Sequence, residues 1–257
     1  HYIVTQCVRG IALSQTDDSI LFSINQVTNP SLTVSSENTE AVDALGVPIA
    51  RFYRSKTAEF SAENSLFDMA LMATQSGTVK KVASKAEKVT SPAFETITID
   101  GSATYDLAHV PTEDVSKIYM LNGDSTIGTI YTANTAASAT EFIFAKTENK
   151  ATITPPTGLV NGDQLFVIYE YEAESAVEVA NAANKFPVGC KFILEVLGCD
   201  VCDQTNLIYA YIIFPNAKLS PDFDWSIATD STHPFSLTAM QDYCSRDKIL
   251  FKVVIPE

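Results

Sequence analysis

Alternation of apolar and polar residues, broken at short intervals by turn-forming pairs, is the feature that most restricts how this chain can fold. Between residues 19 and 27 the apolar side chains Ile20, Phe22 and Ile24 occupy every second position. A period of two is typical of a half-buried β-strand, because successive strand side chains point to opposite faces. The same pattern returns over residues 31–35. The chain is therefore predicted to be mainly β.

One stretch shows helical spacing instead. Leu66, Met69, Ala70 and Ala73 repeat at intervals of three and four residues, as apolar residues do on one side of a helix. We expect this helix to begin at Ser61, whose hydroxyl can accept from the free N–H groups of the first turn. We expect it to end at Gly77, since glycine suits the left-handed position that terminates many helices.

Residues 89–175 are predicted to form a separate module. Turn pairs such as Asp100-Gly101 and Asn122-Gly123 divide this segment into short strands. About seven strands within about 85 residues are typical of an immunoglobulin-like (Ig-like) β-sandwich. Residues 1–88 and 176–257 are then predicted to form one β domain from both ends of the chain, interrupted by this insert. Insertion at an exposed loop is well tolerated.

The charge of the chain is strongly negative and unevenly distributed. The net charge is −14, which argues against wrapping nucleic acid, because neutralising phosphates needs clustered lysine and arginine. Residues 88–180 carry 13 acidic and 4 basic residues, a net charge of −9. This concentration of charge also indicates a separately exposed module.

Motifs that carry catalytic chemistry are missing from the sequence. Its three histidines are His1, His109 and His233, and the last two precede Val-Pro and Pro in predicted loops. There is no nucleophile elbow, phosphate-binding glycine loop or zinc-protease motif. We therefore expect no enzymatic activity and no cofactor. No apolar run approaches the ~20 residues that span a bilayer, and residues 1–9 do not resemble a secretory signal, so no membrane partner is expected.

Cysteine use leaves two alternatives open. The five cysteines are an odd number, which fits free thiols in a reducing cytoplasm better than a disulfide framework. Cys199 and Cys202 have a spacing that can supply two zinc ligands, with Cys190 and Cys244 as the remaining candidates. A structural zinc site normally has a second closely spaced pair, so free thiols are the favoured interpretation.

Two stretches resemble the framework of bacteriophage tail tube (major tail) proteins. The first is FSAENSLFDMALMATQSG at residues 60–77, preceded by predicted strands around Leu32 and Phe52. The second starts at Tyr209 and joins a strand containing PNAKL to a later strand containing HPFSLTAMQD. The resemblance implies a tail-tube-like β-sandwich or barrel subunit with one flanking α-helix. Members of that family often carry Ig-like domains, which agrees with the predicted insert.

The resemblance also implies how the protein works. Subunits of this family form rings, typically hexameric, whose inner strands join into a barrel around a lumen, and the rings stack into a tube. The implied partners are further copies of the chain, other tail proteins, and DNA that passes through the lumen without specific binding. The implied location is the virion, after assembly in the host cytoplasm.

Three segments are candidates for the contacts between subunits. They are unpaired strand edges, the polar segment Glu37–Gly46, which is predicted to be a loop, and the N-terminal segment Tyr2–Leu13, which is predicted to be an arm. Within the loop, Glu37, Glu40 and Asp43 are the predicted assembly residues. Two other functions remain as alternatives: another virion component, such as a capsid decoration protein or a tail terminator, and an Ig-like surface adhesion module.

Overall fold

The computed structural model of the chain describes residues 1–243 and 246–256. The chain divides into two compact units. We call residues 1–80 together with 179–257 the flank unit, and residues 81–178 the insert unit. No helix in the described part of the chain is long and apolar enough to cross a membrane.

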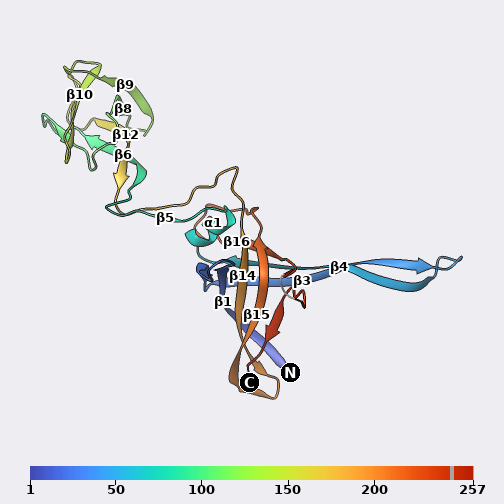
Figure 1. Cartoon of the computed structure of the whole chain (residues 1–257). Coiled ribbons are helices and arrows are strands. Elements are labelled where there is room, and N and C mark those ends of the chain that lie inside the picture. Colours follow the sequence, from blue (N-terminus) through green and yellow to red (C-terminus); the bar gives the residue numbers. More distant parts are fainter. Residues whose placement is uncertain (244–245, 257) are drawn as a thin grey trace. The chain divides into compact units, whose positions relative to one another are not determined.

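The flank unit is built on one antiparallel, eight-stranded sheet (Figure 1). The strand order is β2-β1-β14-β15-β16-β4-β3, and β17 pairs with β15 beside this path. The strands are β1 (Tyr2–Ser14), β2 (Ile20–Ile24), β3 (Val27–Val42), β4 (Pro48–Asn64), β14 (Gly189–Asp200), β15 (Asp203–Leu219), β16 (His233–Ala239) and β17 (Lys252–Val254). The prediction of a mainly β protein is confirmed.

Both ends of the chain contribute neighbouring strands to this sheet. Strand β1 pairs with β14, with Ala12 opposite Phe192, and β4 pairs with β16, with Phe60 opposite Leu237. These four residues are buried. Because the alternating side chains of one face meet in a single core, the sheet is curved and barrel-like.

Phenylalanine rings form the centre of this core. Five buried rings contact one another with centroid separations of 5.6 to 6.4 Å. They are Phe22, Phe60, Phe192, Phe214 and Phe235. Buried aromatic side chains contribute strongly to stability because each removes a large apolar area from water. The alternation of apolar and polar residues in the sequence therefore places these rings together in one core.

The helix of the flank unit begins later than predicted. Helix α1 spans Met69–Gln75, and the Asp68 carboxylate accepts a hydrogen bond from the Leu71 N–H at 2.7 Å. Ser61 is not the cap, because it lies within β4, opposite Ser236 of β16. Strand alternation continues through Asn64, and pairing with two neighbouring strands outweighs the helical spacing there. The left-handed conformation of Gly77 after the helix (φ +65°) is as predicted.

A buried histidine joins α1 to β16. The His233 ring is fully buried, and its Nε2 lies 2.8 Å from Oε1 of Gln75. The other ring nitrogen, Nδ1, accepts from the Asp68 N–H at 3.5 Å. Since an amide oxygen only accepts, the ring is neutral, with its proton on Nε2. Burial lowers the pKa of His233, and the nearby Asp68 carboxylate offsets only part of this effect.

The flank unit is expected to lose stability in mild acid because of His233. An unfolded histidine takes up a proton near pH 6.5, whereas the folded ring stays neutral until the pH falls through its lowered pKa. The neutral His233 ring therefore makes its full contribution to the free energy of unfolding above pH 6.5. This contribution is lost as the pH falls through the pKa of the folded ring. Urea unfolding between pH 5 and pH 8 should show this loss, and His233→Gln should remove it.

The matched control for this prediction is His109→Gln, which removes an exposed histidine of the insert unit. That variant should keep the pH dependence of the flank unit. An unchanged pH profile in His233→Gln would assign the acid sensitivity to the carboxylates instead.

The insert unit contains a seven-stranded sheet and a small stem. The sheet has the order β6-β12-β8-β9-β10-β11-β7, with a parallel pairing between β9 and β10. Its strands are β6 (Val89–Thr98), β7 (Tyr105–Asp106), β8 (Lys117–Leu121), β9 (Ile127–Ala133), β10 (Glu141–Lys146), β11 (Ala151–Thr154) and β12 (Gln164–Ala173). The stem pairs β5 (Lys81–Val82) with β13 (Val177–Glu178), so the two ends of the unit lie side by side. This unit has its own apolar core.

Candidate assembly surface

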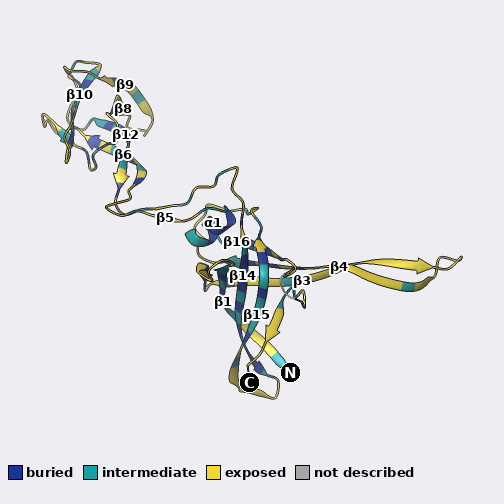
Figure 2. Ribbon diagram, viewed as in Figure 1, coloured by how far each residue is buried: buried dark blue, intermediate teal, exposed yellow. Residues whose placement is uncertain are grey.

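A long hairpin extends from the core of the flank unit. It consists of the distal parts of β3 and β4, and we call residues 35–57 the arm. Every residue of the arm is exposed except Ala50, which is half-buried (Figure 2). At about 3.4 Å per residue, the eight arm residues of β3 give the arm a length of roughly 25 Å. The arm contains Glu37, Glu40 and Asp43, the predicted assembly residues.

The prediction of a loop over Glu37–Gly46 was wrong. Strand β3 continues to Val42 and pairs with β4 along the arm, so only a short turn around residues 43–47 remains. The sequence gives no period of two here, because both faces of the ribbon meet water and neither has to be apolar.

Two of the three predicted acidic residues face arginines across the ribbon. Glu40 lies opposite Arg51 and forms an ion pair with it, and Glu37 lies opposite Arg54. The arm carries three acidic and three basic residues: Glu37, Glu40, Asp43, Arg51, Arg54 and Lys56. The arm is therefore electrically neutral, unlike the rest of the chain.

Asp43 shapes the tip of the arm. Its Oδ1 accepts hydrogen bonds from the N–H groups of Leu45 and Val47, both at 2.9 Å. Gly46 adopts a left-handed conformation (φ +82°) that the turn requires. This arrangement presents Leu45 with 88% of its surface exposed. Asp43 is thus a positioning residue that holds an apolar side chain at the tip.

Large apolar residues lie on both faces of the arm, and the sequence reasoning missed them. Phe52 and Tyr53 are consecutive, so they point to opposite faces, and they are 62% and 66% exposed. Ile49 is 72% exposed. An isolated two-stranded ribbon is only marginally stable, and clustered exposed apolar residues are typical of interaction sites. The arm is suited to contact with another protein surface.

The N-terminal segment is not an arm, contrary to prediction. Residues Tyr2–Ser14 form β1, which pairs with β14 along most of its length and with β2 at its end. The Tyr2 hydroxyl also donates to the carbonyl oxygen of Ile208 at 2.8 Å. Pairing with β14 along nearly its whole length holds this segment in the sheet of its own subunit, so it does not extend from the subunit as an arm. The edges of the sheet path are instead β2 and β3.

The cysteines considered as zinc ligands lie at different places. Cys190 and Cys199 are buried on β14, nine residues apart, which corresponds to roughly 30 Å along a strand. Cys202 is exposed in the turn before β15, and Cys244 lies outside the described residues. Within the described ranges, no group of three or more His, Cys, Asp or Glu residues is arranged to hold a metal ion. Burial raises the pKa of the Cys190 thiol to about 11, which keeps it protonated.

The chain matches the model of a known protein family. The model of the YomU/Tube protein family matches residues 5–249. This range contains the arm, the five-phenylalanine core and the whole insert unit. No curated protein matches the chain.

Proposed function

Because the chain belongs to the YomU/Tube protein family, a family of phage tube proteins, we propose that its copies assemble into stacked, hexameric rings that form the wall of a phage tail tube. The observation that carries this proposal is the arm. It is a neutral ribbon with apolar residues on both faces, and no other described part of the flank unit covers it.

The arm is suited to a contact in which it binds a different part of the neighbouring copy. An arm that docks on a different surface of the next copy makes a head-to-tail contact, and such contacts produce closed rings or open stacks. The edge strands β2 and β3 supply unpaired backbone groups to which a neighbouring copy can add. Neutrality of the arm also matters. A surface without net charge reduces the repulsion between two copies that each carry a charge of −14.

The charge of the flank unit supports passage of DNA without binding. This unit holds 17 acidic and 11 basic residues. Its negative net charge disfavours the phosphate contacts that dominate non-specific DNA binding. The protein acts as a structural component of the virion, assembled in the host cytoplasm, without an enzymatic role.

The insert unit is proposed to be an Ig-like domain on the tube exterior. Its own core and its paired ends support an independent domain, and its 14 acidic against 6 basic residues suit a solvated outer surface. From there it would meet other tail proteins.

Electron microscopy of the purified chain at rising concentration, with sedimentation velocity alongside, tests the proposal. We expect hollow tubes or stacked rings with a regular axial repeat, and a sharp concentration dependence. A closed trimer or a single ring at every concentration would contradict it and would favour a decoration or terminator protein. A monomer under all conditions would favour the adhesion alternative.

A further inference from the structure

The insert unit has a pocket of about 720 Å³ between the loop before β8, the β10–β11 turn and the end of β12. This size falls within the range of small-ligand sites. Residues that matter for its chemistry are His109, Tyr171, Glu148, Asn149, Glu172 and Glu174. The pocket lies wholly within the insert unit, so it is independent of the arm.

An aromatic platform lines the pocket. The His109 ring lies flat on the Tyr171 ring, with centroids 3.8 Å apart and planes at 2°. His109 is exposed and contributes nothing to the core of the unit. A flat, exposed stack beside a pocket is suited to hold a ring-shaped ligand.

The backbone that carries His109 is fixed on its N-terminal side. The Ala108 N–H donates to the Glu95 carboxylate at 3.0 Å, and the His109 N–H donates to the Tyr169 hydroxyl at 3.1 Å. The Tyr169 hydroxyl in turn donates to Glu95. Burial, followed by this hydrogen bond, raises the pKa of Tyr169, so the phenol keeps its proton. These contacts fix the backbone at His109 before any ligand arrives.

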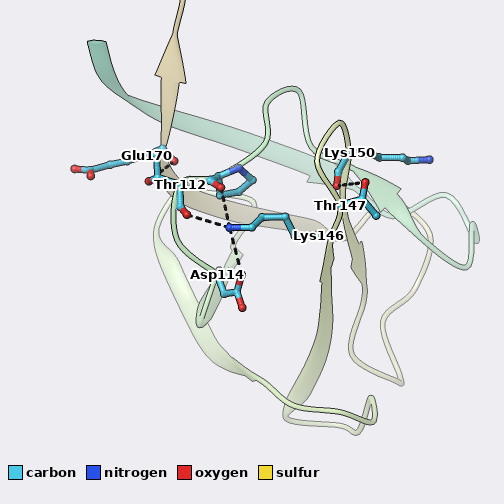
Figure 3. A network of polar contacts seen from close by, with 7 residues as sticks. Thr112, Asp114, Lys146, Thr147, Lys150 and Glu170 are labelled. Carbon is cyan, nitrogen blue, oxygen red and sulfur yellow. Dashed lines mark hydrogen bonds and ion pairs between the residues drawn. The ribbon is translucent and has the colours of Figure 1, made fainter. Parts of the chain in front are cut away.

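A network of polar contacts holds the loop after His109 (Figure 3). The Lys146 ammonium donates to the carbonyl oxygens of Pro111 and Thr112 at 3.1 and 3.0 Å, and it lies 3.5 Å from Asp114. The Thr112 N–H and hydroxyl both donate to the Glu170 carbonyl oxygen, at 2.8 and 3.1 Å. A loop held by so many hydrogen bonds loses little conformational freedom on binding.

The rim of the pocket offers hydrogen-bond acceptors. Glu174 forms an ion pair with Lys88 at 3.2 Å, whereas the carboxylates of Glu148 and Glu172 have no ion pair or hydrogen bond within the described residues. Ionised carboxylates form hydrogen bonds roughly twice as strong as neutral acceptors do. Asn149 adds an amide that both donates and accepts.

We propose that this pocket binds a neutral saccharide. The negative charge of the insert unit disfavours phosphates, nucleic acids and acidic sugars. Its polar rim disfavours lipids, and the absence of a three-ligand cluster among the described residues disfavours a metal ion. A sugar ring offers C–H groups to the His109 face and hydroxyl donors to Glu148 and Glu172.

Titration of the whole 257-residue chain with tetrasaccharides of glucose and of N-acetylglucosamine, followed by calorimetry, tests the proposal. We expect saturable binding that changes little with salt. His109→Ala should weaken it about tenfold or more, which corresponds to about 1.4 kcal/mol. Phe94→Ala is the matched control, because it removes an aromatic ring that is 66% exposed on β6, outside the pocket, and it should bind as wild type.

A second pair of variants decides the result if His109→Ala perturbs the insert unit. His109→Tyr keeps a flat ring and should retain binding, whereas Glu172→Gln keeps the shape and should lose affinity. The proposal is overturned if no neutral tetrasaccharide binds up to about 10 mM. It is also overturned if Phe94→Ala loses as much affinity as His109→Ala. Salt-sensitive binding of spermidine, without saccharide binding, would overturn it in favour of an amine site.

Discussion

A chain carrying Ile49→Ser and Phe52→Ser is expected to stay folded but to stop assembling. Both side chains lie on the arm and are 72% and 62% exposed in the single chain. If a neighbouring copy buries them, each contributes about 1.5–3 kcal/mol to the contact. Losing both should raise the concentration needed for tube formation by about 100-fold or more. Sedimentation velocity and electron microscopy over a concentration series measure this threshold.

Stability of the single chain separates this effect from misfolding. Exposed substitutions usually change the free energy of unfolding by within about 0.5 kcal/mol, so the midpoint of urea unfolding should hardly move. Ile168→Ser is the matched control, since it removes an isoleucine that is 45% exposed on the insert unit. Assembly at the wild-type threshold in the arm variant would show that the arm is not the contact.

The largest expected loss of stability follows from Phe192→Ala. This ring is fully buried and lies 5.6 to 6.3 Å from four other phenylalanine rings. It also fills the space over Gly10, where a Cβ atom would come within 2.9 Å of its Cζ. Replacing a buried phenylalanine by alanine costs about 3–5 kcal/mol, which is a large part of the stability of a typical domain.

Urea unfolding followed by circular dichroism and tryptophan fluorescence measures this loss. Trp225, the single tryptophan, reports on the flank unit, whose transition should move to much lower urea. The unfolding transition of the insert unit should stay at the same urea concentration, because Phe192 is not part of the core of that unit. Phe52→Ala is the control for loss of an exposed ring. A simultaneous shift of both transitions would mean that the two units unfold as one.

Strand alternation predicted well wherever one face of a strand is buried. Residues 20–24 form β2, in which Phe22 and Ile24 are buried as predicted, whereas Ile20, the third apolar residue of the pattern, is 65% exposed beside an irregularity in the pairing with β1. The predicted start of the helix was wrong. Serine is a common N-terminal cap, but the backbone at Ser61 pairs with two neighbouring strands instead. Local propensity is a weak prior when tertiary pairing competes with it.

The candidate surfaces were less predictable than the fold. The sequence predicted a polar assembly loop with Glu37, Glu40 and Asp43, whereas the structure has a hairpin whose exposed apolar residues carry the argument for contact. A usable signal existed, because Glu40 and Arg51 lie where a hairpin around residues 43–47 would bring opposite charges together. The pairing of His109 with Tyr171 had no such signal, since 61 residues separate them in the sequence and only the fold brings them together.

During synthesis of this chain, its first strands are made well before the strands with which they pair. The partners of β1 and β4 are β14 and β16, so residues 1–80 leave the ribosome well before the strands that complete their core. At about 5–20 residues per second, translation of the insert delays these partners by roughly 5–20 s. Until then Phe22 and Phe60 lack the Phe192 and Phe235 rings that they contact in the folded unit, whereas the strands of the insert unit are all made by residue 178. Its stem pairs Lys81 with Glu178, at the two ends of the insert unit, and this shortens the loop that the early strands must close to meet the late ones.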